Sequence, residues 1–334
     1  MTALVEVGPL EWDGLLERLG CADAYLLRGY VESAQILEPG SMVLLHAAGG
    51  GGDVVFPLLA RDPVAGEARD VTTPYGYGGP VAVGEAPPVE EFWELYGDWC
   101  RGHGVVTSFV RFHPLFANQR LAPPAVRLEA LAGTVGWRLN LPDLFAGMDG
   151  THRTACRKAA REGVAVAARE APEDLSAFAA LYERTMRRVG AGDFYLFPRA
   201  YWEALARLRG RIVVFDAEHG GQVVASALCL ATPPWLHYHL GGTGERGREL
   251  GASNLLLYEA ACWARERGYE RFHLGGGAGG RDDSLFSFKR RFDPGGLLEC
   301  AIGKAVHDPE AYERLAGRPA DDLAGFFPAY RERS

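Results

Sequence analysis

The feature that most constrains the fold of this chain is an internal repeat. Two apolar segments separated by a Gly-rich turn occur at 43–59 and again at 212–230, and each pair is typical of a β-hairpin. An aromatic segment that ends in paired glycines follows each hairpin, at 75–79 and at 238–242, and we expect both to be strands. The two copies lie about 163 residues apart.

A helix and a further strand complete each copy. The predicted helices share a Leu-Tyr pair and end at Gly104 and Gly268, because glycine commonly terminates a helix. An Arg-Phe-His triplet lies in the strand expected next, at 111–113 and at 271–273. Features in the same order at offsets of 160 to 164 residues predict a duplicated α/β unit.

Chain length agrees with two domains. The chain has 334 residues, and domains usually contain about 100 to 200. The apolar pattern is interrupted near 140–150, so we expect a first domain at 1–140 and a second at 141–299. Residues 300–334 bury too little surface to form a third domain, and we expect this tail to return to the first.

Composition places the chain among ordinary globular proteins. It is 48% hydrophobic and 23% charged, which disfavours disordered, collagen-like and disulfide-scaffold classes. We see neither a secretory leader nor an apolar run of the roughly 18 residues that span a bilayer, and we expect a cytoplasmic monomer without a membrane span. The six scattered cysteines form no C-x-x-C pair, so we expect reduced thiols and no metal site.

Charge is unevenly distributed along the chain. The net charge of −8 argues against a protein that coats nucleic acid with its whole surface. Residues 151–211, however, carry 12 Lys and Arg against 7 Asp and Glu. This basic segment is either a solvated helical surface or a local contact for an anionic partner.

A glycine-rich loop gives the strongest local signal. A strand is expected to run into glycines at 275–280, after which Asp283 or Ser284 can cap a helix. Leu285, Phe288 and Phe292 recur at i, i+3 and i+7, so we expect them to face the core. Five glycines in six positions indicate a backbone that approaches a ligand or swings over one.

Lys289 lies in the helix after this loop. Only three of the 35 basic residues are lysines, namely Lys158, Lys289 and Lys304. A lysine where the chain otherwise uses arginine suggests a need for a compact ammonium that donates in several directions. The alternative is an ordinary surface lysine at a helix end.

A second candidate is a cationic helix that begins near Thr151. His152, Arg153, Arg157, Lys158 and Arg161 recur at roughly helical spacing. Such a face could contact phosphates, or it could simply be exposed to solvent.

The segment 248–253 and two histidines are weaker candidates. Arg248 to Ser253 is similar to the turn by which acetyltransferases hold the pyrophosphate of coenzyme A, although Ser253 also suits an ordinary helix N-cap. His237 and His239 alternate on one strand, but no third ligand lies near them in the sequence.

These motifs resemble the FemABX peptidyltransferase family over nearly the whole chain. The most specific match is Asp282 to Leu285 followed by Phe288-Lys289-x-x-Phe292. Supporting matches are Arg161 to Val164, Thr185-Met186 and Asp308 to Glu310. The resemblance implies two tandem GNAT-like domains of α/β (α+β) class and the transfer of an amino acid from aminoacyl-tRNA to an amine.

The resemblance also implies roles for individual residues. The lysine of the Phe-Lys pair lies where the aminoacyl ester reacts in this family, which implies catalytic roles for Lys289 and Phe288. We expect substrate contacts from Arg199, Tyr201, Tyr238, Asp282, Asp283, Gly276 and Gly277. We expect tRNA contacts from Arg153, Arg157, Lys158, Arg161, Arg290 and Arg291.

The chain departs from the family pattern at the positions that hold a nucleotide-linked cell-wall pentapeptide. Glu32 stands where a lysine is usual, and Phe197 stands where an arginine is usual. A carboxylate repels a diphosphate, so that substrate is disfavoured. Asp293 replaces a common glycine after the motif. Arg199, Arg187 or Arg188 could replace the cation that usually holds the diphosphate.

The sequence therefore favours an aminoacyl-tRNA-dependent ligase that acylates a small peptide, a natural-product intermediate or a cell-wall precursor. Aminoacyl-tRNA would be a co-substrate, and no resident cofactor is expected because the ester is already activated. A competing hypothesis is an acyl-CoA N-acyltransferase that uses the turn at 248–253. A third is a decayed transferase that only binds a partner or tRNA.

Overall fold

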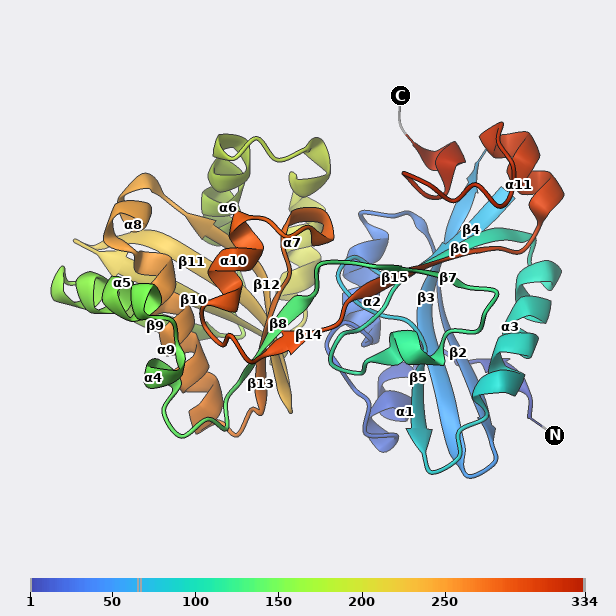
Figure 1. The fold of residues 1–334 in the computed structure, drawn as a ribbon, viewed down its shortest axis with the longest axis horizontal. Helices are drawn as coiled ribbons and strands as arrows, with labels where there is room; N and C mark the ends of the chain where they lie inside the picture. The colour runs from blue at the N-terminus through green and yellow to red at the C-terminus, as the bar shows by residue number, and fades with distance from the viewer. Residues whose placement is uncertain (1, 65, 67, 333–334) are drawn as a thin grey trace. The chain divides into compact units, whose positions relative to one another are not determined.

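The computed structural model describes residues 2–64, 66 and 68–332, which form two compact units (Figure 1). Unit 1 comprises 1–131 and 299–334, and unit 2 comprises 132–298. The C-terminal segment thus returns to the first unit, as expected. The division falls nine residues before the expected boundary at 140, because β8 (Thr134–Arg138) is already a strand of the second sheet.

Unit 1 is built on one mixed sheet with the order β1-β2-β3-β4-β6-β15-β7, and β5 pairs with β3. The β4–β6 pair is parallel and the other pairs are antiparallel. Its strands are β1 (Leu4–Glu6), β2 (Gly40–Gly49), β3 (Gly52–Val64), β4 (Ala68–Thr72), β5 (Val81–Gly84), β6 (Val105–Arg111), β7 (Arg127–Ala130) and β15 (Ala301–Val306).

Strand alternation explains how unit 1 is layered. Val54 and Phe56 of β3 face one core, which α3 (Val89–Gly102) covers, whereas Val55 and Leu59 face another core. The second core is covered by α1 (Trp12–Arg18) and α2 (Arg28–Gln35). A third cluster joins the tail to the sheet through α11 (Pro309–Ala316).

Unit 2 repeats this arrangement with the order β14-β8-β13-β12-β11-β10-β9. In both units an antiparallel hairpin leads to one parallel strand pair, followed by an antiparallel strand. The parallel pair of unit 2 is β12–β13. Its remaining strands are β9 (Ala165–Glu170), β10 (Ile212–His219), β11 (Gln222–Thr232), β12 (Trp235–Thr243), β13 (Arg271–Gly275) and β14 (Leu297–Leu298).

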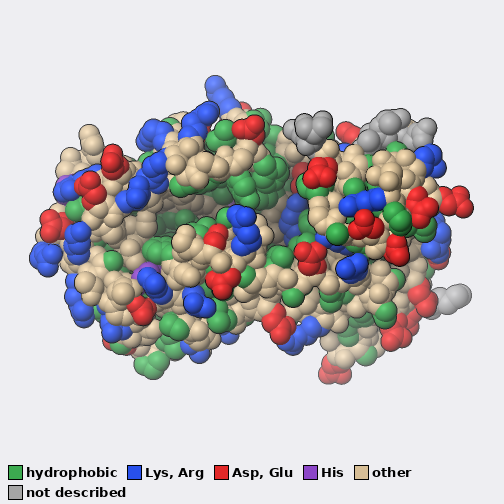
Figure 2. Space-filling model, turned by 45° about the horizontal axis from the view of Figure 1, so that its top comes forward, with side chains coloured by type: hydrophobic (Ala, Val, Ile, Leu, Met, Phe, Trp, Pro, Cys, Tyr) green, Lys and Arg blue, Asp and Glu red, His purple; other side chains and the backbone are tan. Residues whose placement is uncertain are grey.

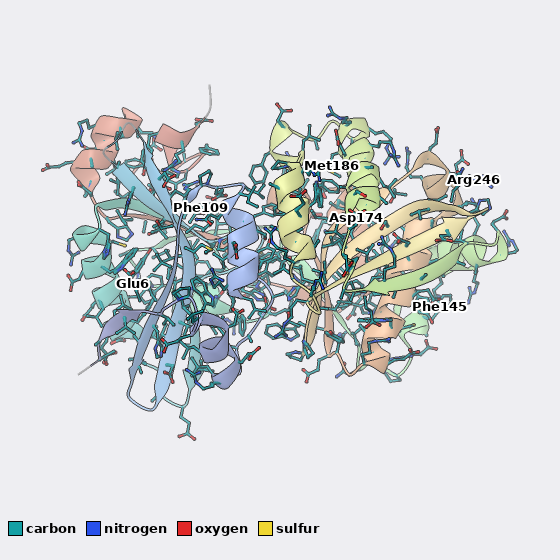
Figure 3. The ribbon with its side chains drawn as sticks, turned by 180° about the vertical axis from the view of Figure 1, so that it is seen from behind. Glu6, Phe109, Phe145, Asp174, Met186 and Arg246 are labelled. Carbon is teal, nitrogen blue, oxygen red and sulfur yellow. The ribbon has the colours of Figure 1, made fainter. Side chains whose placement is uncertain are left out.

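Helices cover both faces of the second sheet (Figures 1 and 3). One face carries the core of unit 2, which takes side chains from α4 (Leu144–Gly147), α5 (Gly150–Arg161), α9 (Ala252–Glu266) and α10 (Ser284–Arg290), and α8 (Glu245–Leu250) packs on α9. The other face carries α6 (Ser176–Arg188), on which Met186 is labelled in Figure 3, and α7 (Arg199–Ala206) packs with it through aromatic rings. Short 3-10 helices span Asn118–Leu121, Asp193–Tyr195, Ala278–Gly280 and Ala329–Arg331.

Both predicted hairpins are confirmed, as β2–β3 and β10–β11. Gly50 and Gly51 have φ of 64° and 96°, and Gly220 and Gly221 have φ of 60° and 76°. Two consecutive left-handed residues are what a tight hairpin turn requires, so glycine is favoured at each position.

The predicted strand at 75–79 is wrong. Gly76 and Gly79 have φ of 103° and 89°, which an extended strand does not allow. The place beside β6 is taken instead by β4. In the second copy, 238–242 lies within β12 as expected. The expected helices are confirmed as α3 and α9.

Two further observations concern the whole chain. All six cysteines are free thiols, and four of them are buried. Among the described residues, none of the helices combines the length and apolar character needed to cross a bilayer.

Candidate functional site

The loop before α10 is folded onto the start of that helix by Asp283. Its carboxylate accepts the backbone N–H of Phe286 and of Ala278, both at 2.9 Å. Partial burial raises the pKa of Asp283, but the amides of Phe286, Ala278 and Leu285 outweigh it and lower the pKa below its ordinary value. The predicted cap is confirmed, and Asp283 also fixes the loop.

The glycines of this loop are required by its own packing. Gly275, Gly279 and Gly280 have positive φ. A Cβ on Gly276 would lie 2.7 Å from the carbonyl oxygen of Gly133, and one on Gly277 would lie 2.1 Å from that of Arg281. Backbone geometry therefore accounts for all five glycines without a ligand.

Lys289 lies beneath this loop and is 7% exposed. Its ammonium donates a hydrogen bond to the carbonyl oxygen of Gly276 at 2.7 Å and lies 5.5 Å from the ring centre of Tyr238 on β12. Burial lowers the pKa of Lys289 to about 8, against the charge of Asp283, which raises it. The side chain is therefore a buried cation at neutral pH whose proton is easier to donate than that of an ordinary lysine.

Phe288 has a different environment from Lys289. Its ring packs 4.9 Å from that of His152 and 5.3 Å from that of Phe292, and its carbonyl oxygen lies 2.9 Å from Nε2 of His152. Phe288 thus holds α10 against α5. The prediction that Leu285 also faces the core is wrong, because its side chain is 42% exposed. Burial lowers the pKa of His152, so this histidine does not join the cationic face predicted for the helix.

The other predicted substrate residues do not all lie at Lys289. Tyr238, Gly276 and Asp283 surround Lys289, and burial raises the pKa of Tyr238. Asp282 and Arg199 are instead exposed, and Arg199 forms an ion pair with Glu203 at 2.6 Å.

Tyr201 is fully buried, and its hydroxyl lies 2.8 Å from Nε2 of His239. Burial, together with the charge of His237, lowers the pKa of His239 to about 3. His237 lies 3.2 Å from His273, measured between their Nδ1 atoms. The two histidines that alternate in the sequence therefore have different partners, and His239 lies at an irregularity in the strand register.

The predicted tRNA-binding helix is confirmed as a helix, α5, but several of its cations are engaged within unit 2. Arg153 donates to the carbonyl oxygens of Ala146 and Met148, and Arg157 lies 5.0 Å from the ring centre of Phe145. Lys158 donates to the carbonyl oxygen of Glu249, Arg161 is exposed beside Glu162, and Arg290 and Arg291 are exposed.

The turn at 248–253 is packed against α5. Arg248 lies in α8 and is exposed, while Gly251 has φ of 72°. A Cβ on Gly251 would lie 3.3 Å from Cβ of Ala155, and Lys158 bonds to the last turn of α8. α5 thus covers part of the turn that a coenzyme A pyrophosphate would use.

One face of unit 2 is visibly hollowed. In Figure 2 the wall of this hollow is largely apolar, and Lys and Arg side chains gather on its rim. Such a surface combines space for a ligand with attraction for anions.

Comparison with known proteins identifies the domain type and the fold of the chain. Residues 149–290 match the family model of the acetyltransferase (GNAT) domain. No curated protein sequence matches the chain.

Three solved structures share the fold. FemX is 15% identical with a TM-score of 0.69, and the alignment covers 94% of this chain and 99% of FemX. The C-terminal DUF2156 domain of an Agrobacterium fabrum protein described as a lysylphosphatidylglycerol synthetase is 16% identical with a TM-score of 0.56, covering 91% and 94%. A tandem GNAT protein from the clavulanic acid biosynthesis pathway is 13% identical with a TM-score of 0.51, covering 92% and 99%. The chain therefore has the tandem GNAT fold that the family resemblance implies, and the region that matches the GNAT domain model lies in its second unit.

Proposed function

We propose that this protein transfers the aminoacyl group of an aminoacyl-tRNA to the amine of a small peptide, a natural-product intermediate or a cell-wall precursor. The observation that carries the proposal is the buried Lys289 ammonium, held between the glycine loop and the ring of Tyr238. The fold shared with FemX and with a protein described as a lysylphosphatidylglycerol synthetase supports the same reaction class.

The chemistry suits a fixed cation. The neutral amine attacks the ester carbonyl and the new C–N bond forms. The ester C–O bond then breaks, and the proton that the amine nitrogen loses ends on the released 3′ oxygen of the tRNA as a hydroxyl. Negative charge develops on the carbonyl oxygen and then on the leaving oxygen. An ammonium prepositioned in a dry site stabilises that charge by a few kcal/mol. Lys289 would fill this role, and Tyr238 would flank the reacting group.

Partner binding follows from the same reaction. The tRNA would approach the basic segment 151–211, where Arg161 is exposed, and Arg290 and Arg291 on the surface of α10 would add phosphate contacts. Because the ester is activated before it arrives, the proposal includes no resident cofactor. Under this proposal the protein acts as a monomer in the cytoplasm.

The test uses the purified full chain, total tRNA charged with labelled amino acids, and a panel of small amines and dipeptides. We expect label to move into a base-stable amide, and ribonuclease added beforehand to abolish the transfer. Lys289→Ala should lower kcat at least 100-fold, whereas the matched variant Ser287→Ala on the same helix should keep most of it. Transfer that resists ribonuclease, or full activity in Lys289→Ala, would contradict the proposal.

A second candidate is acyl-CoA-dependent N-acylation, which the match to an acetyltransferase domain favours. Its donor would bind the turn at 248–253. Calorimetry with coenzyme A separates the two candidates: micromolar binding that Gly251→Glu abolishes would support the acyl-CoA reaction. The contacts of Ala155 and Lys158 with this turn favour the tRNA-dependent reaction instead.

A further inference from the structure

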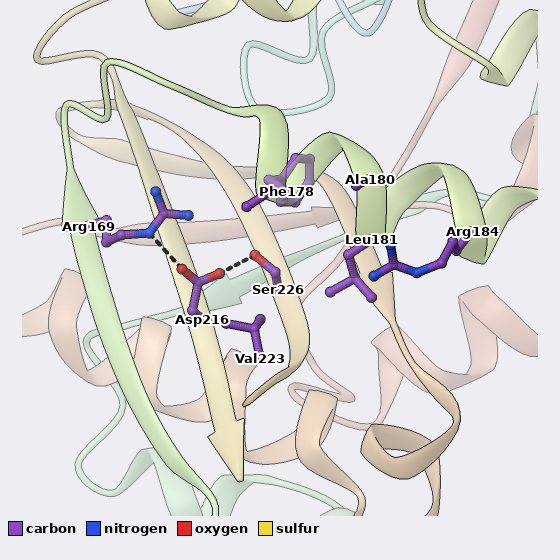
Figure 4. Close-up of a pocket in the computed structure, with 9 residues that line it drawn as sticks. Arg169, Phe178, Ala180, Leu181, Arg184, Asp216, Val223 and Ser226 are labelled. Carbon is purple, nitrogen blue, oxygen red and sulfur yellow. Dashed lines mark hydrogen bonds and ion pairs between the residues drawn. The ribbon is translucent and has the colours of Figure 1, made fainter. Parts of the chain in front are cut away.

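A groove of about 310 Å³ lies between α6 and the strands β9, β10 and β11 of unit 2 (Figure 4). Within unit 2 it is separate from the Lys289 site, because the two lie on opposite faces of the sheet. Asp216 alternates with Phe215 and Ala217, whose side chains enter the core beneath α9. Tyr238, beside Lys289, packs against that core instead.

Small residues on α6 leave this groove open. Ala177 and Ala180 line it, while Phe178 and Leu181 form an apolar wall and Val223 of β11, 44% exposed, lies at its open side. Longer side chains at the two alanines would fill the space that the helix leaves above the sheet.

A buried carboxylate orients one guanidinium in the groove. Asp216 is 6% exposed and accepts hydrogen bonds from Nε of Arg169 at 2.6 Å and from Oγ of Ser226 at 2.5 Å. The bond through Nε leaves both Nη groups of Arg169 without a partner among the described residues. Asp174, the acidic group that precedes α6, is occupied by the backbone N–H and hydroxyl of Ser176.

A second guanidinium lies at the other end of the groove. Arg184 is exposed, and within the described part of the chain it has no hydrogen-bond or ion-pair partner. Figure 4 shows Arg169 beside Asp216 at one end of the groove and Arg184 beyond Leu181 at the other end. The planar donor fork of Arg169, next to an apolar wall, is suited to a carboxylate that carries an apolar group, and Arg184 adds positive charge at the far end.

We propose that this groove binds a small carboxylic acid with an apolar body of about the size of one or two amino-acid residues. The carboxylate would accept hydrogen bonds from the two Nη groups of Arg169, and the apolar body would lie against Phe178, Leu181 and Val223. The volume is at the lower end of the range typical of small-molecule sites, which sets the size of the ligand. This proposal does not depend on the reaction at Lys289.

The test compares three probes with the same chain and different head groups: hexanoate, hexanol and hexylammonium. Titration of the full chain by calorimetry should detect hexanoate binding, with hexanol and hexylammonium at least tenfold weaker. Arg169→Ala should weaken hexanoate binding at least tenfold. The matched variant Arg187→Ala, whose guanidinium is paired with Glu183 on the same helix at 2.7 Å, should leave it unchanged.

Further variants distinguish binding in this groove from binding at the Lys289 site and from nonspecific binding. Ala180→Leu should fill the groove and abolish hexanoate binding while the circular dichroism spectrum stays that of the unaltered chain. Lys289→Ala should bind hexanoate with unchanged affinity, whatever its effect on acyl transfer. The proposal is overturned if hexanoate does not bind at millimolar concentration, if hexanol binds as tightly as hexanoate, or if Arg169→Ala has no effect.

Discussion

Replacing Lys289 by methionine tests whether its ammonium is buried, independently of any substrate. Methionine keeps the length and apolar stem of lysine but carries no charge. The ammonium has its pKa lowered from 10.5 to about 8 in the folded chain, mainly by burial. In the unfolded chain the group regains its ordinary pKa, so between pH 8 and 10.5 the unfolded state binds the proton more tightly.

The direction in which the unfolding free energy changes with pH follows from the pKa of Lys289 in the folded chain and its ordinary pKa. The cost of holding a charged Lys289 in the fold is fully present below pH 8 and is relieved as the pH rises toward 10.5. At about 1.4 kcal/mol for each pKa unit, the unaltered chain should gain about 2 kcal/mol of unfolding free energy relative to Lys289→Met between pH 7 and 9.5. The lost hydrogen bond to Gly276 adds an offset of about 1 kcal/mol that changes little with pH.

Urea unfolding of both chains at several pH values between 7 and 9.5 measures this difference. Arg290→Met, a variant of the exposed neighbour on α10, is the control and should show a pH-independent difference. If the difference for Lys289→Met were equally flat, the ammonium would be hydrated in solution, and both its lowered pKa and its proposed role in a dry site would be refuted.

Three further predictions concern the stability of the fold, and urea unfolding checks each of them. Asp283→Ala should lower the unfolding free energy by about 1 to 2 kcal/mol, because the cap of α10 and the hydrogen bond to Ala278 in the loop both disappear. Asp282→Ala, at an exposed position, should change the unfolding free energy little. Gly242→Val should lose about 1 to 3 kcal/mol, since a Cβ there would lie 2.9 Å from the backbone nitrogen of Tyr182 on α6; an unchanged unfolding midpoint would contradict this close packing. Gly102→Ala should gain about 0.5 to 1 kcal/mol, because a Cβ at the end of α3 meets nothing within 4 Å; a loss would show hidden strain.

The sequence pattern was enough to predict both hairpins and the helices α3 and α9. Apolar runs along 43–59 and 212–230, with a Gly-rich turn inside each segment, predicted the hairpins because turn conformation is a local property. The cap at Asp283 was equally local. The error at 75–79 has the same origin: aromatic content favours a strand, but the positive φ of Gly76 and Gly79 is set by packing that the sequence does not display.

The sequence by itself determined the tandem α/β architecture, the return of the C-terminal segment and the helix that carries Lys289, because these depend on repeat, length and local pattern. Tertiary structure alone decided what surrounds those residues. Burial of Lys289 depends on Tyr238 and Gly276, which reach it from other elements. The groove beneath α6 likewise depends on the packing of α6 against the strands β9, β10 and β11, the second of which carries Asp216. Local preferences act between near neighbours, whereas burial and the resulting pKa arise from contacts between segments distant in the chain.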